Sequence, residues 1–133
     1  MKTFALDSNI LSYILKKDEK VISRLHTEQD RGHECVIPPL AYYEVKRGLL
    51  SVGSKVRLRL FEDMCRDFTV GIMETAAWDK AAQLYAIQRQ SGSLVEEADT
   101  FIAAFCLVGE YTLVTNNTKH FEAFEDLDFT NWK

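Results

Sequence analysis

The sequence has little of what marks a secreted, zinc-binding or membrane protein. Among its 133 residues are three cysteines, three histidines and two prolines. Cys35, Cys65 and Cys106 are odd in number and widely spaced, so neither a disulfide framework nor a zinc site is expected. No apolar run approaches the ~20 residues that span a bilayer, and the N-terminus lacks a basic region followed by an apolar stretch. We therefore expect a cytoplasmic protein with no membrane partner.

The chain also lacks an excess of basic charge. Its net charge of −4 argues against non-specific binding of nucleic acid. Residues 1–94 carry 14 Lys and Arg against 12 Asp and Glu, and residues 95–133 carry 2 against 8. Solvated helix faces account for most of these basic residues, and a polyanionic partner stays open. The absence of a Gly-rich phosphate loop and of a nucleophile–base pair argues against kinase and serine or cysteine hydrolase chemistry.

What is present is a regular alternation of short apolar strands and helices, with no repeat or linker between them. Residues 1–133 are therefore expected to form one domain. Thr75 is predicted to cap a long helix with Tyr85 and Ile87 on its apolar stripe, and Gly109 to end the next helix. Such alternation predicts an α/β fold in which helices cover a central parallel sheet. Strands are predicted at 3–7, 34–39, 68–73, 111–115 and 127–132, and helices at 9–17, 18–31, 39–51, 55–67, 76–91, 97–108 and 119–124.

Asp7 directly follows the first predicted strand, "FAL". In open parallel sheets the ligand site lies beyond the carboxyl ends of the strands, which makes this position one to inspect. Asp is also a good helix N-cap, and that role stabilises a helix by about 1 kcal/mol. Ser8 or Asn9 could cap the helix instead, so the local sequence is compatible with either role for Asp7.

Glu44 lies within the helix predicted at 39–51, one step from the apolar stripe that includes Ala41 and Val45. A surface carboxylate paired with Lys46 or Arg47 is the simpler interpretation of this residue.

Asp99 is the more telling acid, because it shares helical spacing with Ile102, Ala103 and Cys106. It therefore lies at the N-terminal end of an apolar stripe. A negative charge gains there from the helix dipole, but it is costly to bury without a partner. Glu97, immediately upstream, adds to the local negative charge.

The fourth predicted strand delivers Thr115, Asn116 and Asn117 to the same edge of the sheet. An Asn-rich turn is the simpler interpretation, since Asn favours turns for backbone reasons. If the strand ends converge, however, Asn117 would share one crevice with the three acids. Crowded carboxylates repel and raise one another's pKa, and a divalent cation such as Mg²⁺ or Mn²⁺ relieves that conflict. Spacing thus favours metal-assisted phosphodiester hydrolysis by a metal-activated water.

Four segments resemble the PIN-domain ribonucleases, and within them the VapC toxins of bacterial toxin–antitoxin pairs. The segments are "LDSNIL" (usually LDTNIL in that family), "AYYEVKRGL", "ADTFIAA" and "LVTNNTKHF", followed by a closing "LDFTNW". They occur in the family's order and cover nearly the whole chain. The resemblance implies a three-layer α/β/α sandwich and an Mg²⁺- or Mn²⁺-dependent endoribonuclease. It further implies a homodimer that is inhibited by a cognate VapB antitoxin.

The resemblance also assigns roles to individual residues. Asp7, Glu44 and Asp99 match the acidic metal ligands, and Asn117 would complete or orient the site. One departure concerns a fourth acid that many relatives carry in the segment matching "TNNTKHF", where Asn117 and His120 are the candidates here. The residues expected to support the ligands are Ser8, Asn9, Thr115, Asn116 and Glu97, and those expected at RNA phosphates are Lys46 and Arg47.

Two other interpretations stay open at this point. A catalytically weakened PIN-like module that binds RNA or protein would explain the missing fourth acid, although three retained carboxylates argue against it. A metal-dependent phosphatase on a similar scaffold would use a second Asp two residues after the first. Asn9 occupies that position, which argues against a phospho-aspartyl mechanism.

Overall fold

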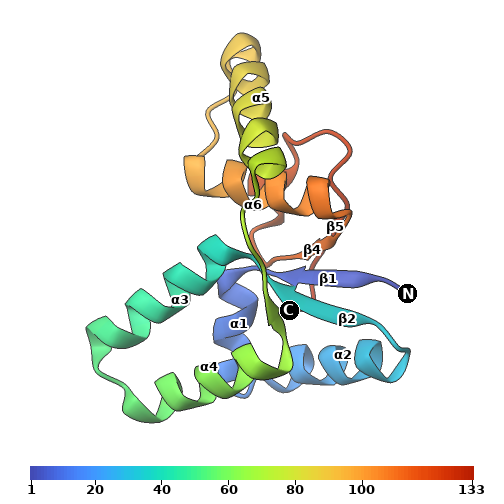
Figure 1. The fold of residues 1–133 in the computed structure, drawn as a ribbon. Coiled ribbons are helices and arrows are strands. Elements are labelled where there is room, and N and C mark those ends of the chain that lie inside the picture. The colour runs from blue at the N-terminus through green and yellow to red at the C-terminus, as the bar shows by residue number, and fades with distance from the viewer.

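A computed structural model of the chain describes all residues 1–133 and shows a parallel sheet between two helical layers (Figure 1). The sheet has five strands in the order β3-β2-β1-β4-β5, and every neighbouring pair is parallel. This arrangement confirms the predicted α/β fold with a central parallel sheet. The strands are β1 (Thr3–Leu6), β2 (Glu34–Ile37), β3 (Thr69–Val70), β4 (Thr112–Val114) and β5 (Phe129–Thr130).

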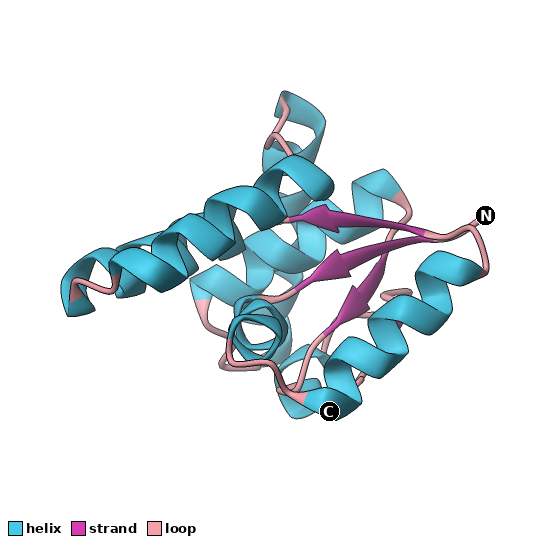
Figure 2. Cartoon of the chain, turned by 90° about the horizontal axis from the view of Figure 1, so that it is seen from below, coloured by secondary structure: helices cyan, strands magenta, loops and turns pink.

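Six α-helices and one short 3₁₀ helix cover the two faces of the sheet. The first four α-helices pack on one face and the last two on the other, as the views from the side and from below show (Figures 1 and 2). None of them is long and apolar enough to cross a membrane. The helices are α1 (Ser8–Leu15), α2 (Glu19–Asp30), α3 (Pro39–Val52), α4 (Lys55–Asp67), α5 (Thr75–Ser91), α6 (Glu97–Gly109) and the 3₁₀ helix η1 (Thr118–Phe121).

Strand β1 divides the core between the two faces, because alternate side chains of a strand point in opposite directions. Phe4 and Leu6 belong to the core under α1 to α4, whereas Ala5 belongs to the core under α5 and α6. All three side chains are almost completely buried. An apolar strand buried on both faces is typical of a parallel sheet, and it fixes the position of the residue that follows it.

Two local predictions on α5 are wrong. Thr75 is the first residue of α5 and Glu74 its N-cap, whereas α6 ends at Gly109 as predicted and Glu110 is its left-handed C-cap. Tyr85 and Ile87 are 54% and 57% exposed. The buried face of α5 is a narrow stripe that these two side chains miss, since it consists of Ala77, Ala81, Leu84 and Gln88.

The order of the strands places the point of reversal beside β1. The chain moves from β1 to β2 and β3 through the helices of one face, and then crosses the other face to reach β4 on the opposite side of β1. The carboxyl ends of β1 and β4 are therefore neighbours where the strand order reverses. Ligand sites of open α/β sheets lie at such points, which directs attention to Asp7 and Thr115.

Candidate functional site

Asp7 occupies the turn between β1 and α1 and is 5% exposed. Its backbone is extended, it is the N-cap of α1, and its Oδ1 accepts a hydrogen bond from the backbone N–H of Ser8 at 2.8 Å. Asp7 itself therefore caps the helix, and neither Ser8 nor Asn9 replaces it in that role. Its burial is far greater than an ordinary surface cap requires.

Two polar side chains hold the other oxygen of the Asp7 carboxylate. The hydroxyl of Thr115, which is fully buried after β4, donates to Oδ2 at 2.7 Å. The side-chain amide of Asn9 donates to the same Oδ2 at 3.3 Å. A carboxylate offers about four lone pairs, and three are engaged by these bonds together with the one from Ser8. One lone pair on Oδ1 stays free for a further ligand.

Asn9 and Asn116 join the turns that follow β1 and β4. Asn9 Oδ1 accepts from the backbone N–H of Asn116 at 2.9 Å. The Asn116 amide donates to the Tyr13 hydroxyl at 3.1 Å, and its Oδ1 accepts from Asn131 at 3.1 Å. Sequence reasoning missed Tyr13 and Asn131, because nothing local to either residue signals a partner so distant along the chain.

Glu44 on α3 and Asp99 on α6 act electrostatically on the same region as Asp7. Burial raises the pKa of all three carboxyl groups, and it is the largest cause in each case. The negative charge of Asp7 raises the pKa of Glu44 and of Asp99 further, and Asp99 also raises that of Glu44. The Ser8 hydroxyl lies beside Glu44 and favours its ionised form. Three separate elements thus bring the predicted acids into one mutually repelling group.

Asn117 and His120 occupy different places relative to these acids. His120 Nδ1 lies 3.2 Å from Asp99 Oδ2, and a positive charge on this ring would lower the pKa of both Asp99 and Asp7. Asn117 is exposed, and its backbone N–H donates to Thr115 Oγ1 at 3.0 Å. The Asn117 side chain makes no hydrogen bond to any of the three acids. Of the two candidates for the fourth position, His120 is the one beside the acidic group.

The remaining predicted residues are more dispersed. The Lys46 ammonium donates to the Tyr42 hydroxyl at 3.0 Å, and this bond raises the pKa of Lys46. The Arg47 guanidinium lies 5.0 Å from the centre of the Tyr43 ring, and its charge lowers the pKa of Glu44. Arg47 therefore lies within electrostatic reach of the acids, whereas Lys46 is committed to a tyrosine. Glu97 is exposed in the first turn of α6 and forms no ion pair.

A cleft adjoins Glu44 on the side of α1 and α4. Its volume is about 310 Å³, and Lys16 and Arg57 bring positive charge to a lining that also includes Ser12 and Gly48. The sequence analysis attributed most basic residues to solvated helix faces and did not single out Lys16 or Arg57. Only the packing of α1, α3 and α4 brings them next to an acid of the site.

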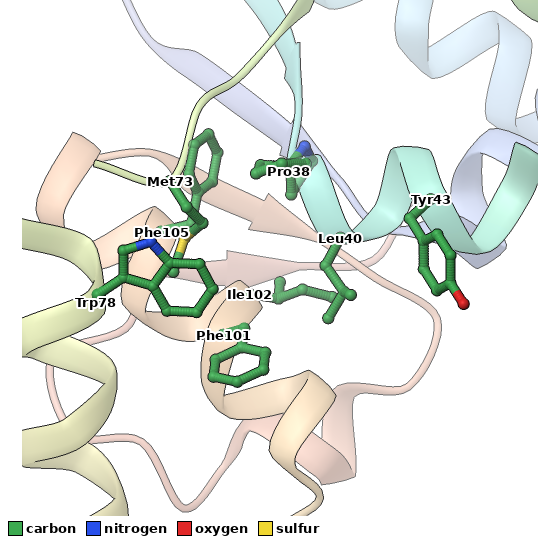
Figure 3. A pocket seen from close by; sticks show the side chains of 9 residues that line it. Pro38, Leu40, Tyr43, Met73, Trp78, Phe101, Ile102 and Phe105 are labelled. Atoms are coloured by element: carbon green, nitrogen blue, oxygen red, sulfur yellow. The ribbon is translucent and has the colours of Figure 1, made fainter. Parts of the chain in front are cut away.

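An apolar cavity of about 250 Å³ lies between α3, α5 and α6 (Figure 3). Leu40 in its lining is one helical turn before Glu44, and Ile102 is three residues after Asp99. Trp78 from α5 is 49% exposed at its edge. The rest of the lining is Pro38, Pro39, Tyr43, Met73, Phe101 and Phe105.

The donor chemistry of the acidic group fits a hard divalent cation. Carboxylate oxygens are the preferred ligands of Mg²⁺ and Mn²⁺, and Asp7 keeps a free lone pair. In their present conformations, no three His, Cys, Asp or Glu side chains are arranged so that they could hold a metal ion. Glu44 and Asp99 are only partly buried, so binding an ion would require their side chains to turn towards Asp7. Neutralising three like charges supplies the driving force.

The chain was compared with known proteins and structures. Curated protein sequences gave no match. A chain of VapBC2 from Rickettsia felis, solved with a promoter DNA fragment, is 20% identical, with a TM-score of 0.89 and coverage of 98% of this chain and 99% of that one. A chain of DNA-bound VapBC from Salmonella typhimurium is 24% identical, with a TM-score of 0.89 and coverage of 100% of both chains. A chain of VapBC-1 from nontypeable Haemophilus influenzae is 22% identical, with a TM-score of 0.84 and coverage of 98% of both chains. The family model of the PIN domain matches residues 4–127, and the chain therefore belongs to the PIN domain family.

Proposed function

We propose that this chain is a VapC-like toxin, a metal-dependent endoribonuclease in which Asp7, Glu44 and Asp99 hold Mg²⁺ or Mn²⁺. The observation that carries the proposal is the convergence of three carboxylates with raised pKa at the point where the strand order reverses. Burying like charges without a partner is costly, and a divalent cation removes that cost. Membership of the PIN domain family supports the same function.

The side chains divide the work of RNA hydrolysis among them. A bound divalent ion polarises a phosphoryl oxygen and lowers the pKa of a bound water. Thr115 and Asn9 fix the Asp7 carboxylate, and one lone pair of its Oδ1 has no hydrogen-bond donor within the chain. Lys16 and Arg57 line the cleft next to Glu44, and Arg47 is close enough to act on that acid. These three cations are our candidates for contacts with RNA phosphates on either side of the scissile bond.

A VapB-like antitoxin is the protein partner that we propose. The three neighbouring structures are VapBC complexes, and a peptide can use the apolar cavity and the acids together. An apolar side chain would fill the cavity beside Leu40 and Ile102, while a cationic side chain one helical turn away would meet Glu44 and Asp99. Such a segment would cover the site and exclude RNA.

Trp78→Ala is expected to weaken binding of this antitoxin by roughly 30-fold, because a buried tryptophan at an interface is typically worth 2 kcal/mol or more. The probe is the protein encoded by the open reading frame next to the gene, and the affinity is measured by calorimetry. RNA cleavage by the variant should be unchanged, since Trp78 does not contact the acids. Val56→Ala, at an exposed apolar residue of α4, is the matched control. Equal affinity of the Trp78→Ala variant and the wild type would contradict this docking site.

We further propose that the chain acts as a single PIN-like domain, pairs with a second copy of itself and works in the cytoplasm, where its RNA substrate is found. Tyr85 and Ile87 on α5 are apolar and exposed, which supports a partner surface on that helix. Sedimentation of the purified chain measures the oligomeric state.

The deciding experiment incubates the purified chain with total cellular RNA in Mg²⁺, in Mn²⁺ or in EDTA. We expect specific cleavage products with either ion and none in EDTA, since the carboxylates have no catalytic partner without a cation. Binding of Mn²⁺ without cleavage of any RNA would instead support the catalytically weakened binding module. That alternative is favoured by a single observation, namely that a histidine rather than a fourth acid lies beside Asp99.

A further inference from the structure

The cleft of about 310 Å³ between α1, α3 and α4 carries two positive charges that have no partner in the fold (Figure 1). The side chains of Lys16 and Arg57 line it and are exposed, and neither forms a hydrogen bond or an ion pair within the chain. Arg57 lies in the first turn of α4, where the helix dipole disfavours a cation. Helix α4 therefore gains nothing from a positive charge at this position.

Gly48 keeps the α3 side of the cleft open. It lies in the helix interior, four residues after Glu44 and four before Val52, so that these three positions form one row along α3. Glycine is less favourable than alanine in the interior of a helix. A β-carbon at Gly48 would meet no atom within 4 Å, and its φ is not positive. Neither packing nor backbone conformation therefore requires a glycine here.

Most of the remaining lining of the cleft is apolar. Leu15 and Val45 are buried, Leu49 is partly buried, and Val52 is 81% exposed. An apolar wall with free cations matches a nucleotide, because its phosphate is anionic and its base presents a flat face for packing. The volume lies at the lower end of the ~300–1,000 Å³ that is usual for small-molecule sites. It suits one nucleotide and is too small for a base pair.

We propose that this cleft binds one unpaired nucleotide of the RNA substrate, next to the scissile phosphate. The phosphate of that nucleotide contacts Lys16 and Arg57, and its ribose and base lie over Gly48 in the space that a longer side chain would fill. The assignment rests on the proposed function, since it assumes that Glu44 belongs to the cleavage site. Gly48 is one helical turn from Glu44, about 6 Å along the helix axis, so the bound nucleotide adjoins the reacting group. Glu44 is the one carboxylate in the lining, and an ion bound to it would remove its repulsion of the phosphate.

Steady-state cleavage of a labelled RNA oligonucleotide tests the steric part of this assignment. The oligonucleotide is built around a site that the wild type cuts in total cellular RNA. Gly48→Leu should raise KM about 10-fold or more with little change in kcat, and Gly48→Ala should raise it less. Tm should not fall, because the new β-carbon meets no neighbour and both residues favour helices more than glycine does. Ser51→Leu, at an exposed position of α3 outside the cleft, is the matched control and should keep the wild-type KM.

The salt dependence of KM tests the phosphate contact separately. Loss of one phosphate contact to a single strand reduces the slope of log KM against log salt concentration by about 0.7. We expect that reduction in Arg57→Ala and in Lys16→Ala, with a KM about 10-fold higher at low salt, as for loss of a charge-assisted hydrogen bond. Arg59→Ala is the matched control, since Arg59 is exposed on α4 and does not line the cleft. Its KM and salt slope should equal those of the wild type.

The results distinguish a failure of this subsite from a failure of the proposed function. A wild-type chain that cleaves RNA, with Gly48→Leu and Arg57→Ala at the wild-type KM and salt slope, overturns the subsite and leaves the endoribonuclease intact. The same result with weaker binding of the antitoxin assigns the cleft to that protein and likewise overturns the subsite. Equal cleavage of the oligonucleotide annealed to its complement overturns the unpaired nucleotide, and a wild type that cleaves no RNA overturns both proposals. Circular dichroism checks folding, and Arg57→Ala decides the test if Gly48→Leu is unfolded.

Discussion

Replacing Asp7 with asparagine is expected to lower divalent-dependent RNA cleavage by about 100-fold or more while the chain stays folded. Even residues that only support metal ligands typically contribute 10- to 100-fold to affinity or activity, and Asp7 is proposed to bind the ion itself. The substitution removes the negative charge at the centre of the acidic group. It leaves the volume of the side chain and its place under α1 unchanged.

The fold should tolerate this change because asparagine can keep most of the hydrogen bonds. Its carbonyl oxygen can accept from the backbone N–H of Ser8 as Oδ1 does now. The new amide would take the place of Oδ2, so the Thr115 hydroxyl, which donates there at present, would have to rotate and accept, and the longer bond from the Asn9 amide would be lost. Burial raises the pKa of Asp7, which means that a neutral group is favoured there. Loss of activity would therefore not reflect unfolding.

Cleavage rates on one RNA, measured at saturating Mn²⁺, provide the comparison. Asp79→Asn is the matched control, since Asp79 is an exposed aspartate of α5 that makes no hydrogen bond or ion pair. It should retain full activity. A folded Asp7→Asn variant that cleaves RNA at the wild-type rate would contradict the metal-dependent mechanism.

Much of this site could be predicted because its signals are local. An apolar strand followed at once by an acid identified Asp7, and helical spacing with buried residues identified Asp99. Parallel strands place their carboxyl ends together, so convergence followed from the order of strands and helices. The alternation of short strands and helices likewise predicted the α/β fold.

The remaining features depend on tertiary packing that no local pattern encodes. The choice between Asn117 and His120 depends on η1, whose direction is set by the burial of Phe121. The double role of Asp7 as cap and buried acid could not be decided, because Ser8 and Asn9 are equally good caps by type. Lys46 and Arg47, by contrast, meet their partners through helical spacing within α3, since Tyr42 is four residues before Lys46 and Glu44 three residues before Arg47.

The stability of the chain should depend on pH and on Mn²⁺ in a linked way. Burial and mutual repulsion raise the pKa of Asp7, Glu44 and Asp99 in the folded chain. Between the ordinary and the raised pKa values, the folded state binds more protons than the unfolded state. The free energy of unfolding contributed by these groups therefore falls as the pH rises through that window. Asp18 and Glu28, whose pKa values are lowered by their basic partners, change stability in the opposite direction.

Comparison with Asp7→Asn isolates the contribution of the acidic group, because Asp18 and Glu28 are common to both proteins. Without metal, the wild type should lose stability relative to Asp7→Asn between pH 4.5 and pH 7.5.

An ion at about 100 times its dissociation constant stabilises a folded protein by about 2.7 kcal/mol, which corresponds to roughly 10 °C in Tm for a chain of this size. We expect that gain from Mn²⁺ at pH 7.5 in the wild type. It should be smaller at pH 4.5, where protons compete for the same oxygens, and absent in Asp7→Asn. Thermal unfolding followed by circular dichroism compares both proteins at both pH values, with and without Mn²⁺. An equal Mn²⁺ effect at both pH values would show that the ion binds elsewhere.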